Sequence, residues 1–155
     1  IKTLDATDPD PAITEAHFSP GSDCRNAIID QLHQARRAVD ICIFTLSDDR
    51  IAEAVLKTHQ RGVAVRMITD NDKSNDEGSD VDFLKGKGVP VRFDRTPYHM
   101  HHKFALFDGQ TLLNGSFNWT RSASDQNEEN ILLTSEKKLI DAFSGRFEEM
   151  WERFR

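Results

Sequence analysis

Six residues between positions 101 and 118 have the types and the spacing to act on a charged, reactive group. They form the pattern His101-x-Lys103-x4-Asp108-x6-Gly115-Ser116-x-Asn118. At an average usage of roughly 5% per residue type, this spacing would arise by chance in about one chain in a million. An imidazole can be a nucleophile or a base, while an ammonium, a hydroxyl and a carboxamide donate hydrogen bonds to anionic oxygens. The pattern therefore predicts a site for an anion with a reactive centre, such as a phosphate ester.

The same stretch predicts a β-hairpin. Residues 102–107 and 111–113 have strand composition, and the pair Asp108-Gly109 between them is a turn signal. Side chains alternate between the two faces of a strand, so the length of the turn decides which residues lie opposite each other. We expect a two-residue turn.

With that turn, the polar side chains of the motif would share one face. His101 would lie opposite Ser116, and Lys103 would lie opposite Asn114. Gly115 lacks a Cβ and would let a ligand or another backbone approach closely. The hairpin is therefore expected to assemble the site.

These residues resemble the signature of the phospholipase D superfamily. The local sequences Met100-His101-His102-Lys103-Phe104 and Gly115-Ser116-Phe117-Asn118-Trp119-Thr120 are similar to single-motif members, namely the bacterial Nuc-type endonucleases and the Zucchini/mitochondrial cardiolipin hydrolase branch. The resemblance extends to Phe18-Ser19-Pro20 and to residues 38–44, 62–66 and 128–130, so it covers nearly the whole chain.

The resemblance implies a mechanism without metal or cofactor. His101 would attack the phosphorus to form a phosphohistidine, and His101 of a partner chain would protonate the leaving oxygen. Lys103 and Asn118 of both chains would hold the nonbridging oxygens, with a further hydrogen bond from Ser116. Because a histidine pKa of about 6.5 lets both protonation states coexist near neutrality, a bell-shaped pH profile is expected.

The remaining motif residues have supporting roles. By the resemblance, Glu129 would orient the nucleophilic histidine as a triad carboxylate does, with Glu128 as the alternative. Asp108 and Gly115 are assigned to the structure, since Asp108 occupies the hairpin turn.

The other histidines and acidic residues are expected to be structural. Alternation along the strand sends His102 to the face opposite His101, and His99 is treated likewise. A metal site formed by His99, His101 and Asp108 is disfavoured because Lys103 shares the pocket. The run of Asp70, Asp72 and Asp76 is interpreted as a solvated loop near the mouth of the site rather than a Mg²⁺ site.

The chain is expected to be one phospholipase D-like domain over residues 1–155, with residues 1–11 as an extended arm. The fold class is α/β, a mixed, largely parallel sheet flanked by helices on both faces. His-x-Lys occurs once, so the resemblance implies a homodimer.

Local patterns predict the elements that must position the motif. Helices are expected to end near residue 37 and to span 51–60, 80–85 and 135–154, with a short helix or turn at 119–124. Strands are expected at 14–18, 39–45, 63–69, 89–93 and 131–134. The aromatic stripe of the last helix is assigned to the core or to a dimer contact.

Composition limits the partners. The net charge of −6 counts against broad binding of nucleic acid, although the basic residues near the motif leave a local basic groove open: Lys85, Lys87, Arg92, Arg95 and Lys103. Cys24 and Cys42 are expected to be core thiols. Since no apolar run is long enough to span a bilayer, we expect no stable membrane association. The expected location is the bacterial cytoplasm or periplasm, and the first residue, Ile1 instead of Met, leaves open whether a targeting segment was removed.

The leading hypothesis is a metal-independent, homodimeric endonuclease that cleaves DNA or RNA, with single strands favoured. The first alternative is a phospholipase D-type hydrolase of cardiolipin or other phosphatidyl lipids. The second alternative is a nucleic-acid-binding module without turnover.

Overall fold

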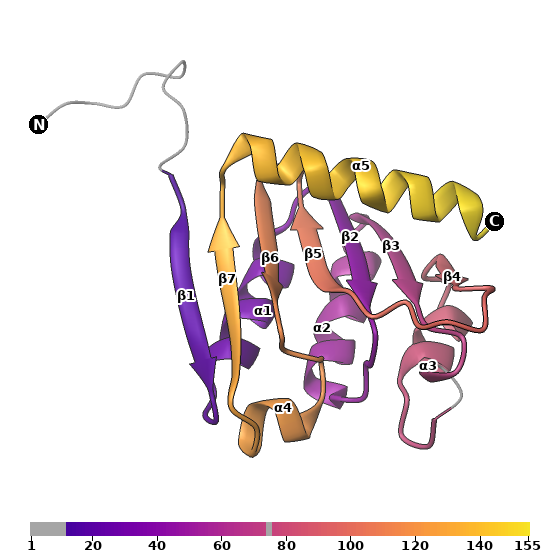
Figure 1. Ribbon diagram of the computed structural model, residues 1–155, viewed down its shortest axis with the longest axis horizontal. Helices are drawn as coiled ribbons and strands as arrows, with labels where there is room; N and C mark the ends of the chain where they lie inside the picture. Colours follow the sequence, from indigo (N-terminus) through magenta and orange to yellow (C-terminus); the bar gives the residue numbers. More distant parts are fainter. Residues whose placement is uncertain (1–11, 74–75) are drawn as a thin grey trace, which may run out of the picture.

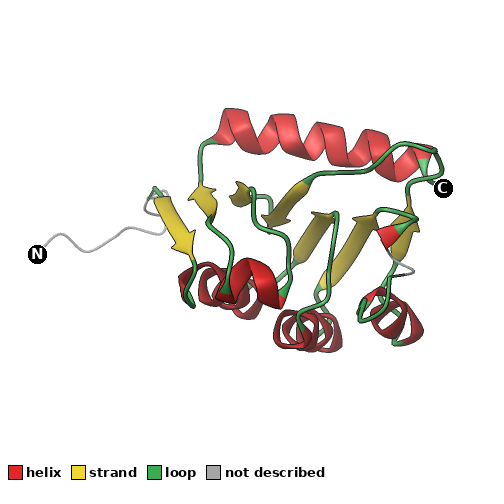
Figure 2. Cartoon of the chain, turned by 60° about the horizontal axis from the view of Figure 1, so that its bottom comes forward, coloured by secondary structure: helices red, strands yellow, loops and turns green. Residues whose placement is uncertain are grey.

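A seven-stranded sheet with helices on both faces forms the structure (Figures 1 and 2), which is a computed structural model describing residues 12–73 and 76–155. The strand order is β1-β7-β6-β5-β2-β3-β4. The expected arm at residues 1–11 lies outside the described residues, and the prediction of one domain over residues 1–155 stays a prediction.

The strands and helices lie close to their predicted positions. The strands are β1 (Thr14–Ser19), β2 (Ala38–Ile43), β3 (Ala64–Thr69), β4 (Val91–Phe93), β5 (Lys103–Phe107), β6 (Thr111–Gly115) and β7 (Glu129–Thr134). The helices are α1 (Asp23–Gln34), α2 (Asp49–Gln60), α3 (Val81–Gly86), α4 (Arg121–Asp125) and α5 (Lys137–Arg153).

The sheet is mixed, as predicted, but its parallel part is smaller than expected. Parallel pairing joins β2 to β3 and β3 to β4. The other four pairs, β1 with β7, β7 with β6, β6 with β5 and β5 with β2, are antiparallel. The alternation of strands and helices that predicts parallel pairing ends at β4, and short connections then favour antiparallel neighbours.

Each face of the sheet has its own core. Helices α1 and α2 pack on one face, and α5 covers the other, a separation that is plain in Figure 2. Phe147 and Met150 belong to the aromatic stripe of α5 and are buried in the core on this face of the sheet, which confirms their assignment to the core. Cys24 and Cys42 are buried free thiols, also as predicted.

The hairpin register differs from the prediction by one residue. Phe104 pairs with Asn114 and Phe107 with Thr111, so the loop has three residues, 108–110, instead of two. Asp108 and Gly109 both have positive φ, at 55° and 64°. Consequently the expected pairs of His101 with Ser116 and Lys103 with Asn114 are wrong, and strand parity does not explain how the polar groups meet.

Asp108 has the structural role that was predicted. Its carboxylate accepts hydrogen bonds from the backbone N–H groups of Ala38 at 2.9 Å, Arg37 at 2.7 Å and Arg36 at 3.0 Å. Burial alone would raise the pKa of this carboxyl, but the three N–H donors lower it. Asp108 thereby ties the hairpin loop to the start of β2, far along the chain.

Gly115 is needed because another backbone passes beside it. A Cβ at this position would lie 2.1 Å from the carbonyl oxygen of Asn130 and 2.8 Å from the Cα of Ile131. Neither atom can move without breaking the pairing of β6 with β7. The sequence predicted that either a ligand or another backbone approaches Gly115 closely. The structure shows that it is another backbone, that of β7.

We predict that Gly115→Ala lowers the free energy of unfolding by about 3 kcal/mol or more, because backbone atoms must shift to admit the methyl group. The matched control is Gly145→Ala in α5, where a Cβ meets nothing within 4 Å. That change should stabilise the helix by about 0.5–1 kcal/mol. Urea denaturation of both variants tests the prediction, and equal stabilities would contradict it.

Candidate active site

The predicted site residues lie at one end of the sheet, where β2 and β6 finish and β5 and β7 begin (Figure 1). The N–H of Phe44 donates to the carbonyl of His102 at 3.0 Å, which places the segment before β5 beside the end of β2. The N–H of Ser116 donates to the carbonyl of Asn130 at 3.0 Å, which places the end of β6 beside β7.

His101 and Lys103 form the centre of the site. The Nζ of Lys103 lies 3.1 Å from Nδ1 of His101 and donates to the carbonyl oxygen of His101 at 3.0 Å. An ammonium can only donate, so Nδ1 is the acceptor. In this arrangement, the ring proton of a neutral His101 is on Nε2.

The site favours the neutral imidazole. Partial desolvation, the neighbouring Lys103 ammonium and His99 lower the pKa of His101, and Asp70 opposes them. Desolvation also lowers the pKa of Lys103, although Glu129 acts in the opposite direction. The Lys103 ammonium, and the His101 ring when it is protonated, therefore lack full compensation of their charge, a condition that suits an anionic ligand.

Phe44 and Lys73 belong to the site and were missed by sequence reasoning. The ring of buried Phe44 lies 4.4 Å from the ring of His101, and the ammonium groups of Lys103 and Lys73 lie 5.5 Å and 5.6 Å from its centre. Lys73 lies in the loop after β3, and sites in α/β proteins gather at the carboxyl ends of parallel strands. That rule was the available signal for Lys73.

Asn118 and Ser116 are fixed by the backbone around the site. The Oδ1 of Asn118 accepts from the N–H of Thr45 at 3.2 Å, which orients the side-chain NH₂ as a remaining donor. The hydroxyl oxygen of Ser116 accepts from the N–H of Asn130 at 3.1 Å and can still donate its own proton. Both residues reach the site after Gly115, where the chain leaves β6.

Glu129 acts electrostatically on Lys103 in the single chain. It begins β7, and its own N–H donates a hydrogen bond to Ser19 Oγ at 3.1 Å. Among the described residues, the carboxylate that influences His101 is Asp70 instead. The role assigned to Glu129 in orienting His101, and the alternative role of Glu128, stay predictions.

Asp70 is a buried residue that ties the loop after β3 to the motif. Its carboxylate accepts from the N–H groups of Met100 at 2.9 Å, Asp72 at 3.1 Å and Lys73 at 3.2 Å. The loop therefore lies beside the site, as predicted.

The acidic loop does not bring its three aspartates together as a ligand set. Possible ligand atoms of Asp70, Asp72 and His99 lie within 4.8 Å of one another, but Asp76 pairs with Lys73 at 3.2 Å. The disfavoured set of His99, His101 and Asp108 is not assembled, because Asp108 lies at the opposite end of β5.

Three of the four basic residues before the motif contact aromatic rings, and the fourth, Arg95, is exposed. Arg92 stacks on Trp151 at 4.0 Å and donates to its carbonyl oxygen. Lys85 and Lys87 lie over Phe93 and Phe83. These cations cover aromatic rings near the β4 edge.

Comparison with known proteins shows similarity over most of the chain. Residues 28–151 match the family model described as cardiolipin synthase, PLD-like domain. Mitochondrial cardiolipin hydrolase of Chlamydomonas reinhardtii is 49% identical over 127 residues, which are 82% of this chain and 57% of that protein. The human protein of that name is 40% identical over 134 residues, 86% of this chain and 53% of that protein. The chain thus spans little more than half the length of these curated relatives.

Two solved structures share the whole architecture. Nuc from Salmonella typhimurium, a phospholipase D family member, has a TM-score of 0.86 at 23% identity and covers 94% of this chain and 97% of its own. NucT from Helicobacter pylori has a TM-score of 0.82 at 25% identity, with 92% and 97% covered. These matches confirm the predicted α/β phospholipase D-like fold.

The expected bacterial location receives no support from the curated relatives, which are named as mitochondrial and come from eukaryotes. In the part of the chain that the structure describes, the helices are too short or too polar to cross a bilayer.

We predict that Lys103→Gln raises the pKa of His101, because a nearby cation disfavours the imidazolium. An NMR titration of the His101 ring protons measures this pKa. Lys138→Gln, on the exposed side of α5, removes the same charge away from the site and should leave it unchanged. A pKa that falls or stays constant in Lys103→Gln would contradict the geometry described for this pair.

Proposed function

The chain belongs to the phospholipase D superfamily of phosphodiesterases, and from that membership we propose that it hydrolyses a phosphatidyl lipid, with cardiolipin as the first candidate. The choice of substrate rests on sequence identity across the stretch that holds the motif. The identity is 49% to the Chlamydomonas reinhardtii protein and 40% to the human protein, both named mitochondrial cardiolipin hydrolase. This proposal reverses the order of the sequence-based hypotheses, in which the endonuclease came first.

The proposed reaction has two displacement steps. An unprotonated ring nitrogen of His101 attacks phosphorus, a P–N bond forms, and the bond to the leaving alcohol breaks as that oxygen takes a proton. Water then attacks phosphorus, gives a proton to the base, and the P–N bond breaks. With cardiolipin, the products would be phosphatidic acid and phosphatidylglycerol.

The side chains around His101 suit each step. When the ammonium of Lys103 turns to a phosphate oxygen, it releases Nδ1 of His101, 3.1 Å away, from its hydrogen bond. The NH₂ of Asn118 and the hydroxyl of Ser116 are the further donors for the nonbridging oxygens. Lys73 places a further ammonium near Phe44 at the same end of the sheet, paired with Asp76 at 3.2 Å.

We propose that a second copy of the chain completes the site. The reaction needs a nucleophile and a separate acid, and the motif supplies one His-x-Lys per chain. His101 is exposed at the end of the sheet, where a second chain can approach it. Measurement of the mass in solution tests this point, and an active monomer would contradict it.

Nucleic acid is the second candidate substrate. Tyr98, three residues before His101, is 78% exposed, and exposed aromatic rings can stack on unpaired bases. A substrate panel separates the candidates: vesicles that contain cardiolipin, and single- and double-stranded DNA and RNA, all in excess EDTA. Cleavage of nucleic acid without lipid hydrolysis would restore the endonuclease hypothesis.

We predict that His101→Asn lowers the rate of lipid hydrolysis by roughly a thousandfold or more, since the nucleophile is lost. His33→Asn changes an exposed histidine at the end of α1 and should retain full activity. Product release from cardiolipin vesicles measures both variants, and excess EDTA should leave the wild-type rate unchanged. Full activity of His101→Asn would remove the assignment, and a wild type that binds nucleic acid and cleaves nothing would support the non-catalytic module.

A further inference from the structure

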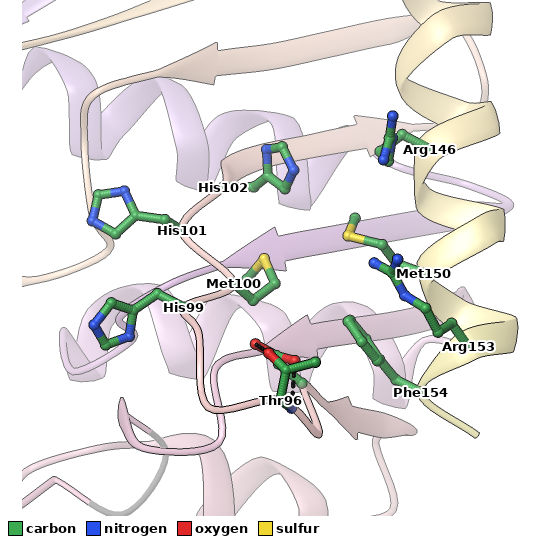
Figure 3. A pocket seen from close by; sticks show the side chains of 10 residues that line it. Thr96, His99, Met100, His101, His102, Arg146, Met150, Arg153 and Phe154 are labelled. Atoms are coloured by element: carbon green, nitrogen blue, oxygen red, sulfur yellow. Dashed lines mark hydrogen bonds between the residues drawn. The ribbon is translucent and has the colours of Figure 1, made fainter.

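A cavity of about 450 Å³ lies behind the His-x-Lys segment, between that segment and the last turns of α5. Figure 3 shows His102 facing α5 across this cavity, whereas His101 and His99, which also line it, turn their rings away from α5. The rings of the two consecutive histidines therefore point in different directions, although both residues line the cavity and their Cα atoms are only about 3.8 Å apart.

The wall of the cavity on α5 carries two arginines. Arg146 and Arg153 line it one above the other on the helix and face the side of the segment that presents His102 (Figure 3). Both side chains are 56% exposed, and each approaches Glu149 only at 3.8 Å or 3.9 Å, too far for a hydrogen bond. Their guanidinium groups therefore keep donors for a ligand.

The floor of the cavity is apolar, and its one acid is already engaged. Met150 and Phe154 are buried at the base. Asp94 also lines the cavity, but its carboxylate accepts from the N–H of Thr96 at 2.9 Å and from the hydroxyl of Thr96 at 3.1 Å. The free polar atoms are thus mostly donors over an apolar base, which suits an anion attached to an organic group.

We propose that this cavity is a second anion subsite, in which His102, Arg146 and Arg153 hold the non-reacting phosphodiester of the lipid while His101 attacks the other one. The inference rests on the proposed function and narrows its substrate to a bis-phosphodiester. In cardiolipin one glycerol joins two phosphates, and the adjacent positions of His101 and His102 would place one phosphate on each side of the segment. The acyl-bearing glycerol of the second phosphate would lie over Met150 and Phe154.

Two lipids that differ in the second phosphate test the subsite. Mixed micelles carry cardiolipin, with two phosphodiesters, or phosphatidylglycerol, with one. For the variant Arg146→Gln/Arg153→Gln we expect the apparent KM for cardiolipin to rise about tenfold or more, as expected for loss of charge-assisted hydrogen bonds. Turnover of phosphatidylglycerol should stay within about twofold of wild type, a change that corresponds to well under 1 kcal/mol.

The controls separate charge from folding. Lys138→Gln removes one charge from the exposed face of the same helix and should change neither substrate. Arg146→Lys keeps the charge and should restore part of the affinity for cardiolipin. An equal loss with both lipids, or no loss with cardiolipin, would overturn the subsite.

A measurement without turnover distinguishes this proposal from the proposed function. Inorganic phosphate should shift the NMR signals of the His102 ring in the wild-type protein and leave them unmoved in Arg146→Gln/Arg153→Gln. If no lipid is hydrolysed while this response is present, the lipid function is wrong and the anion subsite stands. If lipids are hydrolysed and His102 never responds to phosphate, the subsite is wrong and the function stands. If Arg146→Gln/Arg153→Gln raises the KM for oligonucleotides and leaves the KM for cardiolipin unchanged, the proposal that the cavity holds a lipid phosphate is wrong.

Discussion

The antiparallel pairing of β5 with β2 is the interaction on which the site depends. Ile43 lies opposite Lys103, and the N–H of Phe44 extends the ladder to the carbonyl of His102 at 3.0 Å. This ladder joins the parallel strands β2, β3 and β4 to the antiparallel strands β6, β7 and β1. Because it ends where the motif begins, the backbone of His101 is held at the carboxyl end of β2 while its side chain remains exposed.

Most of the fold was predictable because each element carries a local signal. Asp48 caps α2 by accepting from the N–H of Arg50, and aspartate is one of the residues that N-cap positions prefer. Phe147 and Met150 recur at helical spacing on the buried face of α5. Signals of this kind involve residues a few positions apart, so they can be recognised without knowledge of the tertiary structure.

The errors came from interactions between distant parts of the chain. The loop of the hairpin has three residues, and its Asp108 carboxylate accepts from the N–H of Ala38, 70 positions away. The turn dipeptide alone gives no sign of this contact. The place of Lys73 beside Phe44 likewise depends on how the loop after β3 folds back, which buried Asp70 directs through the N–H of Met100. The motif nevertheless predicted which end of the sheet holds the site. His101 lies just before β5, and Ser116 and Asn118 lie just after β6, so these residues meet at the same end of the sheet.

The net charge of −6 is a poor guide to what this site can bind. At physiological ionic strength the screening length is about 8 Å, so acidic side chains elsewhere on the surface repel an approaching phosphate only weakly. At contact distance the balance is different, because Lys103 and His101 lie together. Desolvation lowers the pKa of both groups, and the Lys103 ammonium lowers the pKa of His101 further. Holding them so close costs free energy unless an anion compensates their charge. A bound phosphate offsets that cost by compensating both charges, so the same crowding that disfavours protonation of His101 in the free protein favours an anion once it arrives.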